Sequence, residues 1–326
     1  MKQAAIVVVS YNSAGVIGRC LDSCLRHAAD EADVIVVDNA SSDGTREQVL
    51  RRPAVRLIPN SQNRGFAAAV NQGVAAAGSP CALLLNPDAE LMSGLGPMLD
   101  ACGKGAAAVG GNLVGEHGEP QRGFAVRSLP TAAALALEVL GVNRLWPGNP
   151  VNRRYRCLGR DPGQPGEVEQ PAGAFLMFRK DAWEAVGGFD ESFFPLWFED
   201  VDFCRRLRNK GLAVWYDPRA LARHRGGHSV HQVQWEFRTL CWYASLLRYA
   251  SKHFRPAERR AVCLAASVGA VLRSVTGIWT GRSLTPVVVF GKVIRLALRC
   301  MADGRVGRVS PPAAAQREAG PGSRVK

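Results

Sequence analysis

The sequence predicts an α/β fold, with a mostly parallel sheet flanked by helices and a C-terminal helical extension. Short β-branched runs alternate with segments of helical periodicity over the first hundred residues, which is the pattern of βαβ units. The positive charge is concentrated in the last quarter of the chain, so two segments of different character are expected. Of the 326 residues, 47% are hydrophobic, which is enough for a sizeable core and too many for a disordered chain.

The first elements are expected in strict alternation. Apolar runs predict buried strands at residues 4–9, 34–37, 55–58 and 82–85. Apolar residues at helical spacing predict helices at residues 16–26, 45–51 and 66–77. Strands of this kind belong to a parallel sheet covered on both faces, and ligands bind at the carboxyl ends of such strands. The polar clusters that follow the strands are therefore candidate site loops: residues 10–12, 38–43 and 86–88.

The rest of the chain changes character several times. Residues 115–168 are rich in Gly, Pro and Arg, with one helix candidate at 131–140, and are expected to form a mobile insertion. A strand at 172–178 and a helix at 200–210 resume the α/β pattern. Residues 231–302 have helical periodicity with basic residues between apolar faces, and 303–326 lack periodicity, as a disordered tail does.

The charge distribution and the cysteine content limit the classes of protein to which this chain could belong. The net charge is +13, but residues 1–245 hold 26 basic against 25 acidic side chains and residues 246–326 hold 15 against 3. The predicted sheet region is thus nearly neutral and carries no recognised nucleic-acid motif, so no nucleic-acid partner is expected. Nine cysteines without a C-x-x-C pair indicate reduced thiols and a cytoplasmic protein. No uninterrupted apolar stretch of about 18 residues occurs, so no bilayer-spanning helix is expected.

Two of the candidate loops have both a chemical and a structural interpretation. Asn86-Pro87-Asp88 places a carboxylate after a strand, where it would suit a hard divalent cation, but Asn-Pro-Asp is also ordinary turn chemistry. The loop after residue 37 offers Asp38 to a nucleobase or a ribose hydroxyl. Its later residues Ser42 and Asp43 would equally serve as a helix N-cap, and the two interpretations are compatible.

Two further clusters lie in the second half of the chain. Residues 197–202 place three acids behind aromatic side chains, and a half-desolvated Asp200 would suit a general base for a sugar hydroxyl. The alternative is compensation of a helix dipole, which fits Asp202 better. His224 and His228 have the spacing of a zinc pair, but two intervening glycines disfavour a helix. A single imidazole that joins a carboxylate-bound metal is the preferred interpretation.

Seven sequence blocks occur in an order that resembles a known family. They are VVVSYNSAGVIGRCLDSCL, VIVVDNASSDGT, NRGFAAAVNQG, LLLNPDAEL, PAGAFLMFRKDAWEAVGGFDESFF, WFEDVDFCRRLRNKG and HRGGHS. Together they resemble the inverting family 2 glycosyltransferases of GT-A (Rossmann-like) fold, particularly the rhamnosyltransferase-like bacterial members. The resemblance covers roughly residues 3–230. It implies a GT-A domain over residues 1–230, with 115–168 as a variable acceptor-side insertion, then a basic amphipathic helical region over 231–302 and the tail.

The resemblance also implies roles for individual residues. Asp200 matches the catalytic base, Asp88 stands at the second acid of the metal-binding D-x-D motif, and His224 matches a histidine that joins the metal in some members. The first acid of that motif is Asn86 here, which leaves the motif with one strong carboxylate. Nucleotide and donor-sugar contacts are expected from loops that include Tyr11 and Asp38 at the base; the full set is Ser10, Tyr11, Asn12, Asp38, Asn39, Asn63, Arg64, Gly65, Asn86, Gly173, Ala174 and Glu199.

The implied function is transfer of a sugar with inversion from a dTDP- or UDP-sugar, with Mg²⁺ or Mn²⁺ as the cofactor. The expected acceptor is a hydroxyl of a cell-surface glycan precursor, with a polyprenyl-diphosphate-linked form as the favoured one. The basic helical region is expected to bind an anionic membrane surface, which would place the protein at the inner face of the plasma membrane. The rival interpretation is an inactive GT-A-like protein, or a basic protein that binds nucleic acid or acts as a scaffold.

Overall fold

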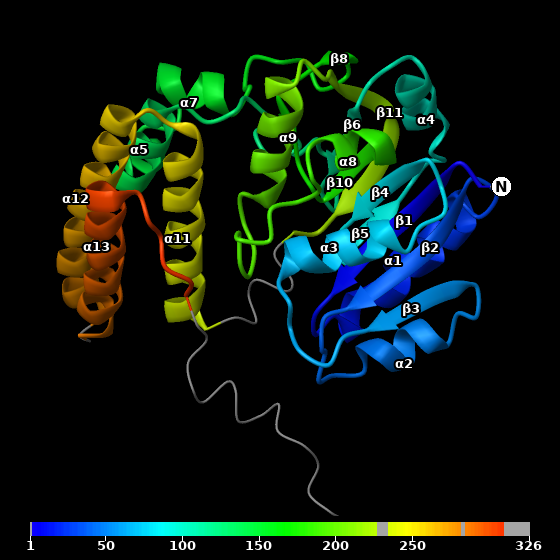
Figure 1. Cartoon of the computed structure of the whole chain (residues 1–326), viewed down its shortest axis with the longest axis horizontal. Helices are drawn as coiled ribbons and strands as arrows, with labels where there is room; N and C mark the ends of the chain where they lie inside the picture. The colour runs from blue at the N-terminus through cyan, green and yellow to red at the C-terminus, as the bar shows by residue number, and fades with distance from the viewer. Residues whose placement is uncertain (1, 227–233, 282–283, 310–326) are drawn as a thin grey trace, which may run out of the picture.

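A mixed sheet with helices on both faces forms the larger part of the molecule in the computed structural model, which describes residues 2–226, 234–281 and 284–309 (Figure 1). The strand order is β3-β2-β1-β4-β10-β6-β11-β5, with β8 (Gly166–Glu167) beside β11. The first four strands of this order run parallel, as predicted: β3 (Val55–Pro59), β2 (Ala32–Asp38), β1 (Ala4–Ser10) and β4 (Cys81–Leu85). The predicted α/β architecture is therefore confirmed.

The remaining strands bring distant segments to the same edge of the sheet. β10 (Phe175–Arg179) is antiparallel between β4 and β6 (Ala108–Val114), and β5 (Ala89–Leu91) is antiparallel to β11 (Val214–His224). β11 runs parallel to β6. The carboxyl ends of β1, β2, β4 and β11 thus share one edge with the amino ends of β5 and β10. All the candidate site loops emerge at that edge.

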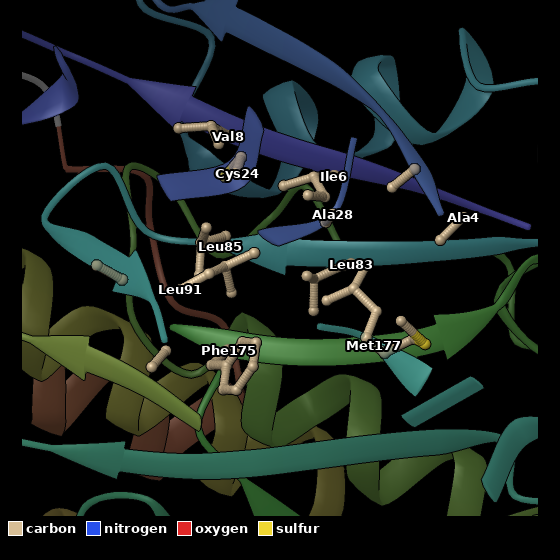
Figure 2. Packing of buried hydrophobic residues seen from close by; sticks show 14 of the residues in the cluster. Ala4, Ile6, Val8, Cys24, Ala28, Leu83, Leu85, Leu91, Phe175 and Met177 are labelled. Atoms are coloured by element: carbon tan, nitrogen blue, oxygen red, sulfur yellow. The ribbon is translucent and has the colours of Figure 1, made fainter. Parts of the chain in front are cut away.

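Both faces of the sheet are buried under helices, because the central strands are apolar on both of their sides along most of their length. Along β1, Ala4, Ile6 and Val8 enter one core, whereas Ala5, Val7 and Val9 enter the other. Figure 2 shows the first core, to which β1 contributes Ile6 and Val8, β4 contributes Leu83 and Leu85, and β10 contributes Phe175. The helices over this core are α1 (Ala14–His27), α2 (Thr45–Leu50) and α4 (Gly96–Gly103). The helices over the second core are α3 (Phe66–Ala75), α8 (Lys180–Ala185) and α9 (Glu199–Asn209).

The segment expected as an insertion contains short elements and one helix that leaves the sheet. Its elements are β7 (Val126–Arg127), α5 (Ala132–Leu140), α6 (Val142–Leu145), α7 (Pro150–Tyr155) and, just after it, β9 (Gln170–Pro171), which pairs with β7. α5 lies where the sequence predicts a helix, begins at a side-chain cap from Thr131 and ends at the left-handed Gly141. Its Leu135 and Val139 pack into the core of the C-terminal helices.

The C-terminal region is a bundle of three helices: α11 (Trp235–His253), α12 (Pro256–Gly281) and α13 (Thr285–Asp303). In Figure 1, α11 lies between the sheet region and the pair α12–α13. Residues 304–309 return along α11, where Ser251 donates to the carbonyl of Gly304 and Arg248 to that of Val306. The tail expected from residue 303 therefore starts with a packed segment, and residues 310–326 lie outside the described residues.

α12 differs from the sequence expectation in one respect. Residues Pro256–Trp279 are long and apolar enough to cross a membrane by length and composition. Only 28% of their 18-residue apolar stretch is buried inside the protein. Arg273 interrupts the stretch, which is why no span was expected. In the structure its guanidinium turns inward and donates to the carbonyls of Val139 and Gly269. Length and composition alone do not separate a spanning helix from one that lies on a surface.

Candidate active site

The first part of the site is the edge formed by β1 and β2, whose last residues, Ser10 and Asp38, are neighbours in register. Asp38 is fully buried. Its carboxylate accepts hydrogen bonds from Ser10 Oγ at 3.1 Å, Ser41 Oγ at 2.5 Å and Ser41 N at 3.1 Å, and from Arg46 Nε at 2.6 Å. Asp38 therefore orders this loop. Its direct contact with a base stays a prediction, and that contact requires one of these donors to be replaced.

Arg46 is a residue that the sequence analysis missed. It lies in the first turn of α2, where a basic side chain opposes the helix dipole unless an acid compensates it. The structure supplies that acid as Asp38, and Arg46 also donates to the carbonyl of Asn60 at 2.9 Å. A basic residue at the start of a helix was the available signal.

The loop after β1 is tied to the same corner. Asn12 has a left-handed backbone (φ 47°), its N–H donates to Ser41 Oγ at 2.9 Å, and its Oδ1 accepts from Ser42 N at 2.8 Å. Tyr11 precedes it and is half-buried. The structure thus brings the predicted residues 10–12 and 38–39 together.

Asn39 links this corner to the loop before α3. Its Nδ2 donates to Asn63 Oδ1 at 2.9 Å and its Oδ1 accepts from Arg64 N at 2.9 Å, while the Arg64 side chain is exposed. Gly65 has φ 86°, and a Cβ there would lie 2.7 Å from the Phe194 ring. Only glycine fits, because the 190–198 loop closes over this position. The predicted residues 63–65 therefore lie between the β2 corner and the segment that leads into α9.

Asp88 and His224 meet on the other side of the edge. Ala89 and His224 are paired residues of β5 and β11, which places the side chain of Asp88 beside the imidazole. His224 Nε2 lies 3.5 Å from Asp88 Oδ1, and both residues are almost fully buried. Asn86 Nδ2 lies 3.4 Å from the same Nε2. The two predicted metal residues, separated by 136 positions in the chain, are thus neighbours.

Gln121 fixes the orientation of this imidazole, and the sequence analysis missed it. Its Nε2 donates to the carbonyl of His224 at 2.7 Å, so its Oε1 is the acceptor that faces His224 Nδ1 at 3.1 Å. Nδ1 therefore faces an acceptor on Gln121, and Nε2 is the ring nitrogen that faces Asp88. Phe124 stacks on the ring, with centroids 5.2 Å apart and planes 9° from parallel. No spacing pattern connects residue 121 to residue 224, so the sequence held no signal for this contact.

The donor chemistry of this cluster fits a divalent cation that a substrate completes. Within residues 2–226, 234–281 and 284–309, no group of three His, Cys, Asp or Glu side chains could by itself hold a metal ion. Mg²⁺ is commonly held by one or two carboxylates together with substrate phosphates. The carboxylate of Asp88 and the oriented Nε2 of His224 match that kind of partial site, with the Asn86 amide beside them.

Asp200 begins the third part of the site, in the first turn of α9. Its Oδ2 accepts from Gly173 N at 2.9 Å and its Oδ1 from Val201 N at 2.8 Å, and the residue is half-buried. A Cβ at Gly173 would lie 3.0 Å from the Cβ of Asp200, so the close approach requires glycine. The neighbouring Ala174 carbonyl accepts from Asn86 N at 3.1 Å. Gly173 and Ala174 thereby connect Asp200 to the Asp88 side of the edge.

The chain enters α9 through a strained backbone. Trp197 and Phe198 both have left-handed φ values, 76° and 68°, which is rare for bulky residues and is typical of functional loops. The helix starts at Glu199, one residue before the predicted start. This turn ends the loop and starts α9, so that Asp200 lies in the first turn of the helix at the sheet edge.

The two acids beside Asp200 have different surroundings. Burial, followed by the nearby charge of Asp200, raises the pKa of Glu199 well above its usual value, and its Oε2 is buried without a hydrogen-bond partner. Asp202 points to the opposite side, where Arg206 Nε lies at 2.7 Å, His253 Nε2 at 2.7 Å and Lys252 Nζ at 2.8 Å. Of the three, Asp200 is the carboxylate that is partly exposed, and its role as the general base stays a prediction. His228, the second histidine of the pair considered from the sequence, lies outside the described residues.

Comparisons with known proteins identify the family of this chain. The family model described as glycosyl transferase family 2 matches residues 5–185, and one described as the N-terminal domain of galactosyltransferase matches residues 153–228. The chain is 30% identical over 240 residues to an N-acetylglucosaminyl-diphospho-decaprenol L-rhamnosyltransferase of Mycobacterium tuberculosis, covering 69% of this chain and 76% of the relative. It is 27% identical to a pre-mycofactocin glycosyltransferase of the same organism, covering 82% of this chain and 53% of the relative.

Solved structures share the fold at low sequence identity. A mannosyltransferase from Pyrobaculum calidifontis, in complex with GDP-Man and Mn²⁺, has a TM-score of 0.50 at 18% identity, covering 91% of this chain and 80% of that one. A GalNAc-T7 structure with UDP, GalNAc and Mn²⁺ has a TM-score of 0.54 at 14% identity, covering 77% and 50%. The fold is thus of GT-A type, as the resemblance implied. Since the family model spans more than half of the sequence, this chain is a glycosyltransferase that belongs to glycosyl transferase family 2.

Proposed function

We propose that this protein transfers L-rhamnose, with inversion, from a dTDP-sugar to a hydroxyl of a glycan precursor linked to polyprenyl diphosphate. One observation carries the mechanistic part: Asp200 is held half-buried by Gly173 at the same sheet edge as the Asp88–His224 pair. The sugar and the acceptor are supported by the 30% identical relative, whose name states an L-rhamnosyl transfer to a decaprenyl-linked N-acetylglucosamine. A UDP-sugar is the alternative donor.

The reaction in this proposal is a single in-line displacement. Asp200 takes the proton of the acceptor hydroxyl while that oxygen forms its bond to the anomeric carbon. The bond from the anomeric carbon to the diphosphate breaks on the opposite face, and its electron pair leaves with the nucleoside diphosphate. Mg²⁺ or Mn²⁺ would be held by Asp88 and His224 and would supply positive charge to the departing diphosphate. The β1–β2 corner and residues 63–65 would bind the nucleotide.

The proposed location follows from the acceptor. Nucleotide sugars are cytoplasmic substrates, and a polyprenyl diphosphate is anchored in a membrane, so the enzyme would work at the inner face of the plasma membrane. The region after residue 245 supports this, since it holds 15 basic against 3 acidic residues. We expect a peripheral protein that binds anionic lipid.

The decisive experiment is a transfer assay with the full chain. Purified protein is incubated with dTDP-L-rhamnose or a panel of UDP-sugars, a short-chain polyprenyl-diphosphate-linked N-acetylglucosamine and Mn²⁺ or Mg²⁺. Product formation is measured by mass spectrometry and the anomeric configuration by NMR. We expect one inverted product, and loss of transfer when the metal is chelated.

The same assay tests the rival interpretation. An inactive GT-A-like scaffold would neither transfer sugar nor release nucleoside diphosphate with any donor. A nucleic-acid-binding protein would retain RNA or DNA in a filter assay at physiological salt, which the near-neutral sheet region argues against. Either result would contradict the proposal.

A further inference from the structure

α12 exposes an apolar stripe along its whole outward side. Seven of its large hydrophobic side chains are more than 40% exposed: Leu264, Val268, Val271, Leu272, Val275, Ile278 and Trp279. Their spacing of three, four and seven residues places them on one helix face. Trp279, at the end of this stripe, is 85% exposed. A helix on the surface of a globular protein normally presents charged residues there, so this face is unusual.

The opposite side of α12 is an ordinary packed face. Val262, Cys263, Ala266 and Ala270 are fully buried with residues of α5, α11 and α13. The one charged residue between positions 261 and 279, Arg273, also turns toward α5. The core of the bundle is therefore complete without the outward stripe, and the exposed residues do not serve the packing of this chain.

Exposed basic residues lie on α12 itself and on α13, the helix that packs against it. Arg260 is exposed near the start of α12, and Arg295 and Arg299 are exposed on α13, the helix packed beside it. Exposed apolar residues continue at the start of α13, with Val287 and Val288. Exposed apolar residues together with exposed arginines on one pair of helices are typical of a surface that binds at the boundary between acyl chains and anionic headgroups.

The same contacts argue against a spanning arrangement. α13 and α5 pack along α12, so all three would enter the bilayer together if α12 crossed it. Arg295 and Arg299 would then lie at membrane depth, where charged side chains are strongly disfavoured. An orientation parallel to the membrane surface would bury the stripe without carrying α13 and its arginines across the bilayer.

We propose that the outward face of α12 is a membrane-docking surface that lies in the plane of an anionic bilayer. The proposal deepens the proposed function, because it names the surface that would bring the site to a lipid-linked acceptor. The occupant is the lipid surface rather than a second copy of the chain, since the exposed arginines of α12 and α13 are complementary to anionic lipid and would repel the same residues of another copy.

Vesicle co-sedimentation of the full chain tests this surface without any need for catalysis. The probes are phosphatidylcholine vesicles with and without about a third of phosphatidylglycerol. We expect binding to the anionic vesicles, and a loss of at least tenfold in the double variant Val268→Asp/Val275→Asp. The matched control is Leu50→Asp, at an exposed leucine of α2, which should bind as the parent does. Arg295→Gln and Arg299→Gln should each weaken anionic binding about fivefold.

Two further readouts fix the orientation. Trp279→Phe should keep binding but remove most of the blue shift of tryptophan fluorescence on anionic vesicles. Alkaline carbonate should release the bound protein, as it does peripheral proteins. Retention after carbonate would overturn the in-plane arrangement. Equal vesicle binding by the Val268→Asp/Val275→Asp variant, with its fold verified by circular dichroism, would overturn the surface itself.

Sedimentation velocity tests whether a second copy of the chain, instead of lipid, covers this surface. A dimer that forms without lipid, that the same double variant dissociates, and that fails to bind vesicles would make a second copy the partner and overturn the proposal. Failure of the proposed function has a different signature. In that case vesicle binding persists, but no sugar is transferred to either a vesicle-embedded or a short-chain water-soluble acceptor.

Discussion

The sheet region and the C-terminal helices distribute polar and apolar groups in opposite ways. Among the described residues, seventeen buried polar or charged residues lie within positions 2–226, and the helical region adds only Ser245. Twelve of the sixteen exposed large hydrophobic side chains lie in positions 234–309, and four lie in the much longer sheet region. Burying a polar group costs free energy unless the group is hydrogen-bonded. The many buried polar groups of the sheet region are therefore expected to serve a site.

The difference assigns the two regions different tasks. The buried polar groups of the sheet region include Asp38, Asn39, Asp88, Glu199 and His224, all at one edge of the sheet. The helical region has no comparable polar cluster among its described residues, and its distinctive feature is an uncovered apolar face. Chemistry is therefore expected to depend on the first region, and location on the second. The predictions below test that division.

The largest effect is expected at Asp200. Asp200→Asn removes the proton acceptor but keeps the size of the side chain, so turnover should fall by about a hundredfold or more while donor binding stays nearly unchanged. Turnover is measured with a water-soluble acceptor, and donor affinity is measured by calorimetry.

The control for Asp200 is its neighbour. Glu199→Gln should retain more activity, because the raised pKa of Glu199 already favours the protonated acid. Near-normal turnover in Asp200→Asn together with an inactive Glu199→Gln would move the general base by one residue.

The next effect concerns the junction between the two regions. Asp202 on α9 is fully buried and holds Arg206 together with Lys252 and His253, the last two residues of α11. Asp202→Ala leaves these groups without their shared carboxylate and should lower the free energy of unfolding by about 3–5 kcal/mol. Urea denaturation measures this change.

A surface pair provides the control for Asp202. Asp181→Ala removes the partner of Arg179, where the carboxylate is 69% exposed, and should cost less than about 1 kcal/mol. If both variants unfold like the parent, the two regions are not joined through Asp202.

The third effect concerns metal binding and follows from the orientation of the His224 imidazole. Gln121→Ala removes the acceptor for Nδ1 and should weaken Mn²⁺ binding in the presence of nucleoside diphosphate by about tenfold or more. Manganese electron paramagnetic resonance measures bound and free ion without catalysis. Gln164→Ala, an exposed residue in the same segment, is the control. Unchanged binding in Gln121→Ala beside a loss in His224→Ala would assign the orientation to Phe124 stacking instead.

The sheet was predictable because its signals are local. β1 to β4 and the helices between them were expected within about two residues of their ends, since buried parallel strands are continuous apolar runs. The convergence of residues 10–12, 38–39 and 86–88 followed from the shared edge of parallel strands. The family resemblance then implied that Asp88, Asp200 and His224 belong to one site.

The contacts that complete the site were not predictable from the sequence. Asp88 meets His224 because β5 is antiparallel to β11, and no local pattern specifies the partner of a three-residue strand. Gln121 and Arg46 act through single long-range hydrogen bonds. α5 packs into the core of the C-terminal helices and not against the sheet. Its own sequence shows an apolar face but does not specify which element that face contacts. The outward face of α12 was hidden for a similar reason: both of its sides are apolar, so periodicity could not show which one is buried.

The smallest effect is expected at Asp190, and its dependence on pH tests how Lys252 stabilises the junction between the two regions. Burial opposes ionisation of Asp190, but hydrogen bonds from Lys252 and Ser192 lower its pKa to about 2. A carboxylate whose pKa is lowered by folding stabilises the protein above its unfolded pKa of about 4, and this contribution is lost as the pH falls toward 2. After allowance for solvent screening, the contribution is about 1–2 kcal/mol. Asp190→Asn should therefore lose stability at pH 6 but fall less steeply than the parent between pH 4 and pH 2, in urea denaturation at each pH. Parallel curves for the two proteins would show that Lys252 stabilises the junction through Asp202 alone.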